Sequence, residues 1–450
     1  MTATAGGLTT TSGSSKRDRG GATDGLATDG DGAAGRYEEL IRADRVHSSL
    51  YTDPEVYADE LERIWHTGWV YVAHESEVAQ PGDYCTKTIG TQPVIVARQA
   101  SGEVSVLLNR CSHLANLLCH EHKGNSSTFR CPYHGWTFRN TGALIGVPYP
   151  SGYGKGFDRS AHDLAHAAQV ESYRGFVFAS LAGRQPPLLE HLGHAREAID
   201  RLCELSPEGE VELRAGWLRH RTATNWKIVY ENEVDGYHAN FVHRSLRRLG
   251  NWSLLDEADV TSEKSLSQVR YLGNGHADID WRPQFRKVGR KYLWVGATAE
   301  EKLVDYAAAL AVRHGDSGAA ALLVDGPPHA VIFPNLFIAE LFILVIQPLG
   351  VGESIQHQTP IGWKGAETLN RRVLQQTGGS IGPAGMVIAD DSAMYERNFA
   401  GMAAREPQWL LRARGLEREE LLEDGTEVSN VTDDTPHRGF WRHYRDLMSD

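Results

Sequence analysis

Two cysteines and two histidines occur as mixed pairs within one short stretch of the chain. Cys111 and His113 form a CxH pair, and after 17 further residues Cys131 and His134 form a CxxH pair. Two thiolates and two imidazoles on facing loops can bind a [2Fe–2S] cluster with two Cys on one iron and two His on the other. The alternative is a structural Cys₂His₂ zinc site, but zinc sites usually pair CxxC with HxxxH. The mixed pairs therefore favour a redox cluster.

A carboxylate and two histidines gather in a second stretch, residues 225–243. Asp235, His238 and His243 lie within nine positions of one another, and two His with one carboxylate are the ligands of non-haem Fe(II) oxygenases. Asp235 and His238 share one face of a helix, whereas His238 and His243 would lie ~140° apart on a regular one. We therefore expect the helix to be widened or broken between the histidines, with a π-bulge as the natural form. The alternative is a helix with solvated acids and two incidental histidines.

The residues around both stretches resemble a known enzyme family. Gly135-Trp136 follows the second pair, and residues 225–243 match the pattern NWKxxxENxxDxYHxxxxH. From about residue 40 to the final Arg438-Gly-Phe-Trp, the chain resembles the large (α) subunit of Rieske non-haem iron aromatic-ring-hydroxylating oxygenases. The resemblance implies that a Rieske [2Fe–2S] cluster is bound by Cys111, His113, Cys131 and His134, and a mononuclear Fe(II) by His238 and His243.

In this family the acid before the two histidines is usually not a ligand. The resemblance therefore gives Asp235 the role of a hydrogen-bonded bridge from His238 to His134 of a neighbouring subunit. Such a bridge would orient the imidazole and offer a path for the electron.

The third iron ligand is expected in residues 381–391, which are similar to the family's late GPAG…DD segment. Asp391 is the expected ligand and Asp390 the alternative. Pro383 suits the first turn of a helix. Val387 and Ile388 stand where the family often has an acid and an aromatic residue, so this wall of the pocket is altered.

Two departures bear on the branch of the family. Respiratory Rieske proteins brace the cluster with a disulfide at positions that correspond here to Asn116 and Tyr133, and neither is Cys. This departure favours the oxygenase branch, which needs a less oxidising cluster. Leu114-Ala115 stands where many oxygenases have Arg-Gly. The remaining cysteines are expected to be small buried hydrophobes: Cys85, Cys119 and Cys203.

The sequence gives only a weak indication of the substrate. By resemblance, Asn232 stands where relatives that oxidise apolar hydrocarbons often have an aromatic residue, which favours a polar or carboxylated aromatic. Arg397 could pair with a substrate carboxylate, although an exposed or structural role is the stronger expectation. The pocket is expected to include Glu231, Asn232, Gly236, Ala239 and residues near Val387.

The resemblance also implies partners. No Gly-rich nucleotide-binding fingerprint follows a strand, so NADH oxidation is expected on a separate reductase, with a ferredoxin between. Family α subunits form homotrimers or α₃β₃ assemblies with a small β subunit. The expected reaction is cis-dihydroxylation of an aromatic ring by O₂. The alternatives are a Rieske monooxygenase or demethylase, a one-electron carrier, and a zinc-stabilised binding protein.

These residues require two kinds of scaffold. Residues 1–35 hold few large apolar side chains and are expected to be disordered. Short β-prone runs such as 93–97, 104–108 and 175–182 predict a compact β domain. Further on, helices are expected over 53–69, 188–205, 299–312 and 384–403, and strands over 211–222, 330–339 and 342–347. The predicted fold is α+β, with a small all-β Rieske domain (66–184) inserted into a larger catalytic domain (36–65 and 185–450) around a central antiparallel sheet of helix-grip, START-like type.

Charge and hydropathy exclude other classes. The net charge of −12 disfavours partnership with nucleic acid or an anionic membrane. No apolar run approaches the ~20 residues that span a bilayer, and the first residues lack the apolar core of a secretory signal. The expected location is the cytoplasm.

Overall fold

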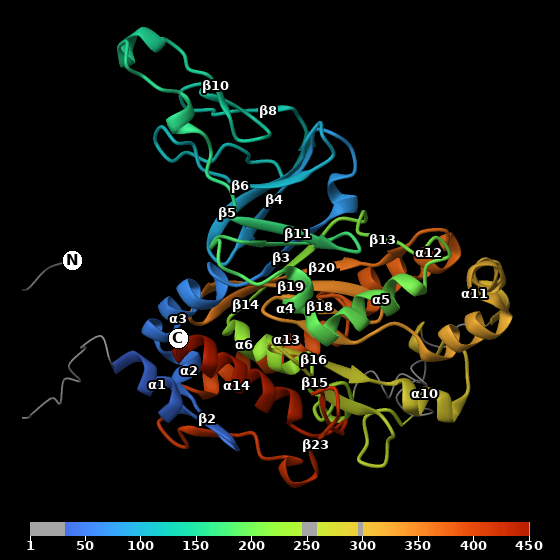
Figure 1. Ribbon diagram of the computed structural model, residues 1–450. Coiled ribbons are helices and arrows are strands. Elements are labelled where there is room, and N and C mark those ends of the chain that lie inside the picture. The colour runs from blue at the N-terminus through green and yellow to red at the C-terminus, as the bar shows by residue number, and fades with distance from the viewer. Residues whose placement is uncertain (1–31, 245–258, 296–299, 450) are drawn as a thin grey trace, which may run out of the picture.

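The computed structural model describes residues 32–244, 259–295 and 300–449. A β domain projects from a larger α+β body (Figure 1). Most of the segment expected to be disordered, residues 1–31, lies outside the described residues, and residues 32–35 belong to helix α1, Gly32–Leu40. Among the described residues, no helix combines the length and apolar character needed to cross a membrane.

The β domain contains three small antiparallel sheets. Its strands over 93–97, 104–108 and 175–182 were expected and are confirmed, and each buries a continuous run of residues. The first sheet has the order β6-β5-β4-β7, the second β10-β9-β8 and the third β11-β12-β3. The bounds are β3 Val70–His74, β4 Asp83–Ile89, β5 Gln92–Arg98, β6 Val104–Leu108, β7 Lys123–Asn125, β8 Thr128–Arg130, β9 Thr137–Arg139, β10 Leu144–Gly146, β11 Gln169–Tyr173 and β12 Phe176–Ser180.

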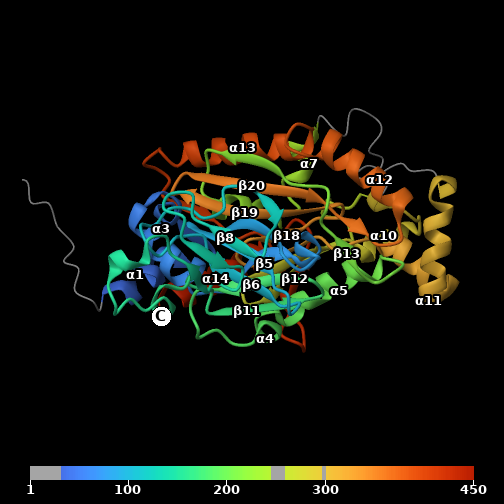
Figure 2. The ribbon, with the colours of Figure 1, turned by 90° about the horizontal axis from the view of Figure 1, so that it is seen from above.

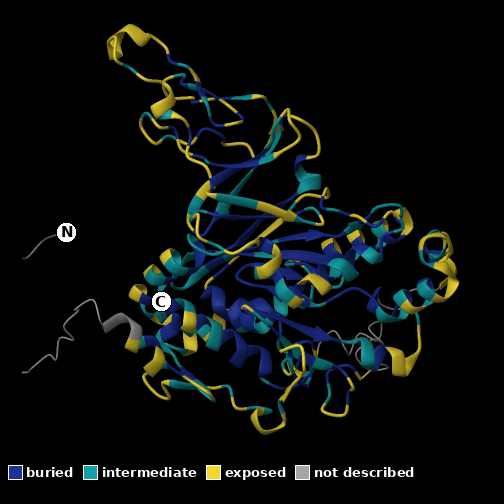
Figure 3. Ribbon diagram, viewed as in Figure 1, coloured by how far each residue is buried: buried dark blue, intermediate teal, exposed yellow. Residues whose placement is uncertain are grey.

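A nine-stranded antiparallel sheet forms the centre of the larger body, in the order β14-β20-β19-β18-β17-β16-β15-β24-β23. Its middle strands are buried along their whole length (Figure 3). The bounds are β14 Leu218–Thr222, β15 Gln268–Gly273, β16 His276–Asp280, β17 Ala330–Ile332, β18 Leu336–Ile338, β19 Phe342–Gly350, β20 Glu353–Pro360, β23 Glu420–Leu421 and β24 Glu427–Asn430. Two smaller sheets join β1 Ile41–Arg42 and β2 Arg45–His47 with β22 Trp409–Leu411, and β13 Val211–Glu212 with β21 Gly362–Trp363.

Two predicted strands are each divided in the structure. Residues 330–339 form β17 and β18 as an antiparallel pair, because Pro334 between them lacks the N–H that a continuous ladder requires. Residues 211–222 form β13 and β14, which belong to different sheets. Gly216 lies between them with a φ of 87°, a left-handed conformation that glycine adopts readily.

Helices of the larger body pack against strands of the central sheet. The bounds are α2 Ser49–Thr52, α3 Pro54–Glu60, α4 Leu188–Leu192, α5 Arg196–Glu204, α6 Trp226–Asn232, α7 Ala239–Val242, α10 Arg282–Val288, α11 Val304–Asp325, α12 Glu367–Gln376, α13 Val387–Gly401 and α14 Thr435–Ser449. Figure 2 shows α12 and α13 along one edge, beside β19 and β20, with α11 at the end of the body.

The predicted helices differ from the observed ones at their ends. The helix over 53–69 exists but finishes as a π-helical segment, Leu61–Trp65. The helix over 188–205 is divided into α4 and α5 at Gly193, which has a φ of 47°. The helix over 384–403 begins only at Val387, so Pro383 lies before its first turn. The helix over 299–312 is α11, preceded by a 3₁₀ turn at 300–303; residue 299 lies outside the described residues.

The segment before the β domain packs on the end of the chain. The rings of Tyr37 in α1 and Tyr444 in α14 meet edge-on at 6.3 Å, and Trp65 meets Trp226 of α6 at 5.2 Å. Buried Glu60 accepts hydrogen bonds from Trp226 Nε1 at 2.8 Å and Tyr444 Oη at 2.6 Å, and it pairs with buried Lys227. The start and the end of the chain therefore both hold α6 in place.

Candidate metal centres

Two loops at the outer part of the β domain have the same backbone design. Cys111 N–H donates to the carbonyl of Asn116 at 2.9 Å, and the N–H of Ala115 donates back to the Cys111 carbonyl at 2.9 Å. In the second loop, Cys131 N–H donates to Trp136 at 2.7 Å and Gly135 N–H donates to Cys131 at 3.0 Å. Each loop therefore presents its cysteine at the start of a closed turn.

The side chains of these loops converge. The rings of His113 and His134 lie 4.7 Å apart, and Trp136 stacks on His113 at 4.9 Å with an interplanar angle of 7°. Cys111 and Cys131 are buried, whereas His134 is exposed. His113 Nδ1 is buried and has no hydrogen-bond partner among the described residues. Two buried thiols and two imidazoles nearer the surface fit a cluster with its Cys-bound iron inside and its His-bound iron outside.

The two departures noted in the sequence have structural consequences here. Ala115 has a φ of 58°, a left-handed conformation that favours glycine, at the position equivalent to Gly135 in the other loop. Asn116 Nδ2 donates to Cys131 Sγ at 3.8 Å. The first of the two positions that correspond to the respiratory disulfide therefore makes a polar contact to the Cys131 sulfur. Cys85, Cys119 and Cys203 are free and buried, as expected.

The second site is built on short helices in the larger body. Helix α6 ends at Asn232, a turn follows, and α7 carries His238 just before its first residue and His243 just after its last. His243 N–H donates to Ala239 at 3.3 Å, which is α-helical spacing. The π-bulge expected between the histidines is therefore absent from this described segment. The rings converge instead because His243 leaves the helix with a ψ of 25°, and their centroids lie 5.4 Å apart.

Helix α13 supplies the carboxylate that faces both histidines. Asp391 Oδ1 lies 3.5 Å from His238 Nε2 and 3.3 Å from His243 Nε2. One ligand atom from each of the three residues lies within 4.8 Å of the others. Asp390, in contrast, faces the other nitrogen of His243, with Oδ2 3.8 Å from Nδ1. The structure thus brings together His238, His243 and Asp391.

The electrostatics of this group fit a cation. Asp391 is 3% exposed, and its Oδ1 accepts no hydrogen bond from the described residues. Burial raises the pKa of Asp391 to about 6 and lowers the pKa of His243 to about 3. A carboxylate and a neutral imidazole held in this way are suited to bind Fe(II) through oxygen and Nε2.

Asp235 lies outside this group, on the far side of His238. Its Oδ1 accepts hydrogen bonds from the backbone N–H of Tyr237 at 2.6 Å and of His238 at 3.3 Å. Its Oδ2 lies 3.7 Å from His238 Nδ1, the nitrogen that faces away from Asp391. Although burial opposes the charge, Asp235 raises the pKa of His238 to about 9. Gly236 follows Asp235 in the chain. A Cβ atom at position 236 would lie 2.4 Å from the carbonyl oxygen of Val431, so only glycine fits there.

Contacts between α6 and α13 fix the distance between the histidines and Asp391. Asn232 Nδ2 donates to Tyr395 Oη at 3.2 Å, and Tyr395 Oη donates to buried Glu233 at 2.9 Å. Behind α6, Glu231 accepts from Tyr51 Oη at 2.6 Å and Trp441 Nε1 at 2.8 Å. Glu231 therefore braces α6 and does not line the cavity at the histidines, contrary to the expectation from the sequence.

A cavity of about 180 Å³ opens beside His238, His243 and Asp391. Asn232, Gly236, Ala239 and Val387 line it, as expected. Arg397 is exposed on α13 and does not, so its pairing with a bound substrate is not supported. Further lining residues were not foreseen from the sequence: Glu233, Trp281, His329, Phe337 and Glu340. Glu233 stands at a variable position of the 225–243 pattern, and the other four lie in or beside β16, β17, β18 and β19 outside any motif, so no sequence signal pointed to them.

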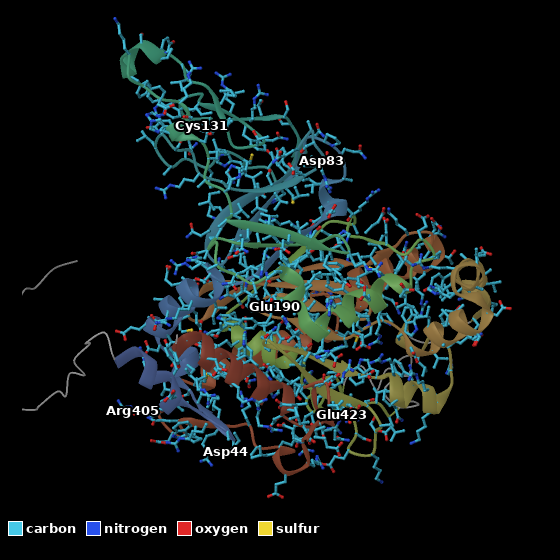
Figure 4. All side chains as sticks on the ribbon, viewed as in Figure 1. Asp44, Asp83, Cys131, Glu190, Arg405 and Glu423 are labelled. Atoms are coloured by element: carbon cyan, nitrogen blue, oxygen red, sulfur yellow. The ribbon has the colours of Figure 1, made fainter. Side chains whose placement is uncertain are left out.

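The two sites lie in different parts of the chain. Figure 4 shows Cys131 in the projecting β domain, away from the body that carries α6, α7 and α13. An electron that passes from the cysteine and histidine loops of the β domain to the histidines of the larger body therefore needs either a long path within one chain or a second copy of the chain.

Comparison with known proteins gives consistent matches. Residues 68–173 match the Rieske [2Fe–2S] domain family, and residues 209–450 match the catalytic domain of the ring-hydroxylating alpha subunit family. The chain is 32% identical over 390 residues to the 2-halobenzoate 1,2-dioxygenase large subunit of Burkholderia cepacia, covering 82% of this chain and 80% of that protein. It is 34% identical over 303 residues to the N,N-dimethyl phenylurea N-demethylase subunit alpha of Sphingobium sp. strain YBL2, covering 67% and 64%. A structure of naphthalene 1,2-dioxygenase with indole in the active site superposes with a TM-score of 0.79 at 26% identity, covering 91% and 94%.

Proposed function

Because this chain belongs to the family of ring-hydroxylating oxygenase α subunits, we propose that it is the terminal oxygenase for cis-dihydroxylation of a polar or carboxylated aromatic compound. It is an oxidoreductase whose cofactors are a Rieske [2Fe–2S] cluster and a mononuclear iron. The observation that carries the proposal is the convergence of His238, His243 and Asp391 at the wall of a mostly apolar cavity.

Each proposed site residue has a distinct task. Cys111, His113, Cys131 and His134 hold the cluster; His238, His243 and Asp391 hold the iron. When bound, the cluster supplies single electrons and the iron supplies open positions for O₂ beside the substrate. Asp235 orients the His238 ring through Nδ1. Asp235 lines both the cavity at the iron-binding residues and a second cavity that His437 also lines, so another subunit can reach it. The apolar wall holds the ring and keeps water away from it.

The partners and the finer architecture are also part of the proposal. We infer a homotrimer or an α₃β₃ assembly in which His134 of one subunit approaches Asp235 of the next. Electrons come from NADH through a separate reductase and a ferredoxin in the cytoplasm. The packing of Tyr37 and Trp65 on the C-terminal half supports the view that the Rieske domain (66–184) is inserted into a helix-grip catalytic domain (36–65 and 185–450).

Metal analysis with EPR of the dithionite-reduced protein tests the proposal. About three irons per chain and a Rieske-type signal are expected, two irons from the cluster and one from the second site. Zinc without a signal would overturn it and leave a zinc-stabilised binding protein.

A monooxygenase or demethylase is the second candidate, because one relative at 34% identity is an N-demethylase. The iron ligands do not separate the two reactions. Turnover under ¹⁸O₂ does: two labelled oxygens in the product indicate dihydroxylation, and one labelled oxygen or a lost methyl group indicates the alternative.

A further inference from the structure

Three polar side chains in the wall of the cavity form one hydrogen-bonded network. Glu340 lies in the turn between β18 and β19, His329 just before β17, and Trp281 just before α10. Glu340 Oε1 accepts from Trp281 Nε1 at 2.7 Å and from His329 Nδ1 at 3.1 Å. All three line the same cavity as the iron-binding residues.

The partners of His329 fix its charge. Its Nε2 lies 2.8 Å from the backbone carbonyl of Glu233, and its Nδ1 faces the Glu340 carboxylate. Both partners are acceptors, so both ring nitrogens must carry a proton, and His329 is an imidazolium. Burial opposes this charge, yet Glu340 raises the pKa of His329. Burial alone would raise the pKa of Glu340, but His329 lowers it.

Glu340 keeps one oxygen for a ligand. Both described side-chain donors, Trp281 and His329, bind Oε1, and no described side chain donates to Oε2. The Glu340 side chain is 26% exposed, and it lines the cavity beside the iron-binding residues. An ionised carboxylate is an acceptor only. The cavity therefore offers a fixed acceptor to its occupant.

The other residues of the cavity wall offer little positive charge to stabilise a bound anion. Among the described residues of the cavity wall, none is Lys or Arg, whereas Glu233, Asp235, Glu340 and Asp391 are acids. The volume of about 180 Å³ is comparable with a cavity of roughly 150 Å³ that binds benzene. A single ring with one small substituent matches this space.

We propose that Glu340, positioned by Trp281 and His329, is a specificity-determining residue that selects an aromatic ring bearing a neutral hydrogen-bond donor, such as an arylamine, over a ring bearing a carboxylate. This inference rests on the proposed function and narrows it to the polar, donor-bearing half of the expected substrates. Glu340 accepts a hydrogen bond from the substituent, while the apolar wall contacts the ring. A benzoate would place two carboxylates together in a desolvated cavity, which is unfavourable.

Calorimetric binding to the anaerobic holoenzyme tests this without turnover. The probes are aniline, toluene and benzoate, which share a phenyl ring and differ in one substituent, with acetate as the control for a carboxylate bound to the metal alone. The wild-type protein is expected to bind aniline about tenfold more tightly than toluene, as one hydrogen bond to a charged acceptor implies. It should bind benzoate no more tightly than acetate.

Glu340→Gln reverses the polarity of the site. Trp281 and His329 both donate, so they hold the amide oxygen and turn the NH₂ group toward the cavity. This variant should lose the preference for aniline and bind benzoate at least tenfold more tightly than the wild type does. Glu340→Leu should prefer toluene. Glu353→Gln, a change of the same kind on β20 at a residue that pairs with Arg221 outside the cavity, should behave as the wild type.

The outcomes separate this inference from the proposed function. A Glu340→Gln variant with normal iron content and Rieske signal but an unchanged aniline-to-benzoate ratio overturns the role of Glu340 alone. If that variant fails to fold, wild-type binding of benzoate that equals or exceeds binding of aniline overturns it as well. Absence of iron and of the Rieske signal from the wild type would instead overturn the proposed function.

Discussion

In the β domain, two adjacent loops carry all four proposed cluster ligands between Cys111 and His134, whereas the iron site in the larger body joins α7 to the distant helix α13. The loops hold their ligands through backbone hydrogen bonds within each turn. The helices hold theirs through side chains that cross between elements, such as Asn232 to Tyr395. A site of the first kind depends on its own short segment, and a site of the second kind depends on the packing of the whole body. The two sites should therefore respond independently to substitution.

Reciprocal ligand variants test this independence and should have the largest effect. His238→Ala removes one imidazole of the iron site, so activity should fall to background and iron should drop from about three to about two per chain, with the Rieske EPR signal retained. Cys131→Ser should abolish the signal and also activity. Cys119→Ser, which removes a buried thiol outside the two loops, serves as the control. Loss of both sites in His238→Ala would contradict two independent sites.

Asp391 and Asp390 sharpen the description of the iron site. Asp391→Asn keeps the side-chain shape but removes the charge that faces both Nε2 atoms, so we expect iron affinity to fall by at least about 10–100-fold, the range found even for residues that only support a ligand. Asp390→Asn is the matched neighbour and should change affinity less than about tenfold. Iron titration of the apoprotein measures both. The reverse order of effects would make Asp390 the ligand.

Asp235→Asn probes the link between the two regions. The amide preserves the turn but no longer holds the His238 ring with a charge, so turnover should fall about 10–100-fold. Iron content and the Rieske signal should stay near wild type, because Asp235 faces Nδ1 and not the iron side of the ring. Reduction of the iron site under single-turnover conditions should slow in parallel. An unchanged turnover rate would remove Asp235 from the pathway.

The same contrast explains what the sequence could predict. The proposed cluster site could be predicted because its four ligands lie within one short segment, Cys111–His134, where their spacing indicates how they converge. The fold class followed from the family motifs. The convergence of Asp391 with the histidines was expected only through resemblance to the late segment, since nothing local relates α13 to α7. Glu340, His329 and Trp281 meet only after the sheet has folded, and no pattern marked them.

The wrong predictions have local causes. The π-bulge was inferred from ideal helical angles, but α7 is one turn long and His243 leaves it through its backbone torsion. Glu231 was placed in the pocket by resemblance to the family, yet it turns to Tyr51, Trp441 and Arg412 on the other side of α6. Gly193 and Pro334 interrupt elements that apolar periodicity alone would continue.

The smallest expected effect lies in the β domain and concerns the polar contact between Asn116 and Cys131. Asn116→Ala removes the Nδ2 hydrogen bond to Cys131 Sγ. This hydrogen bond withdraws charge from the sulfur and so favours the reduced cluster, and its loss should lower the reduction potential. A net hydrogen-bond contribution of about 0.5–1.5 kcal/mol corresponds to a decrease of roughly 20–60 mV in a one-electron potential. Potentiometric EPR titration measures this shift, and Asn125→Ala, at a similar polar residue on β7 away from the two loops, is the control. Iron affinity at the second site should not change, because no side chain links Asn116 to α7 or α13 among the described residues. A potential that rises or stays constant would show that Asn116 braces the loop and does not tune the cluster.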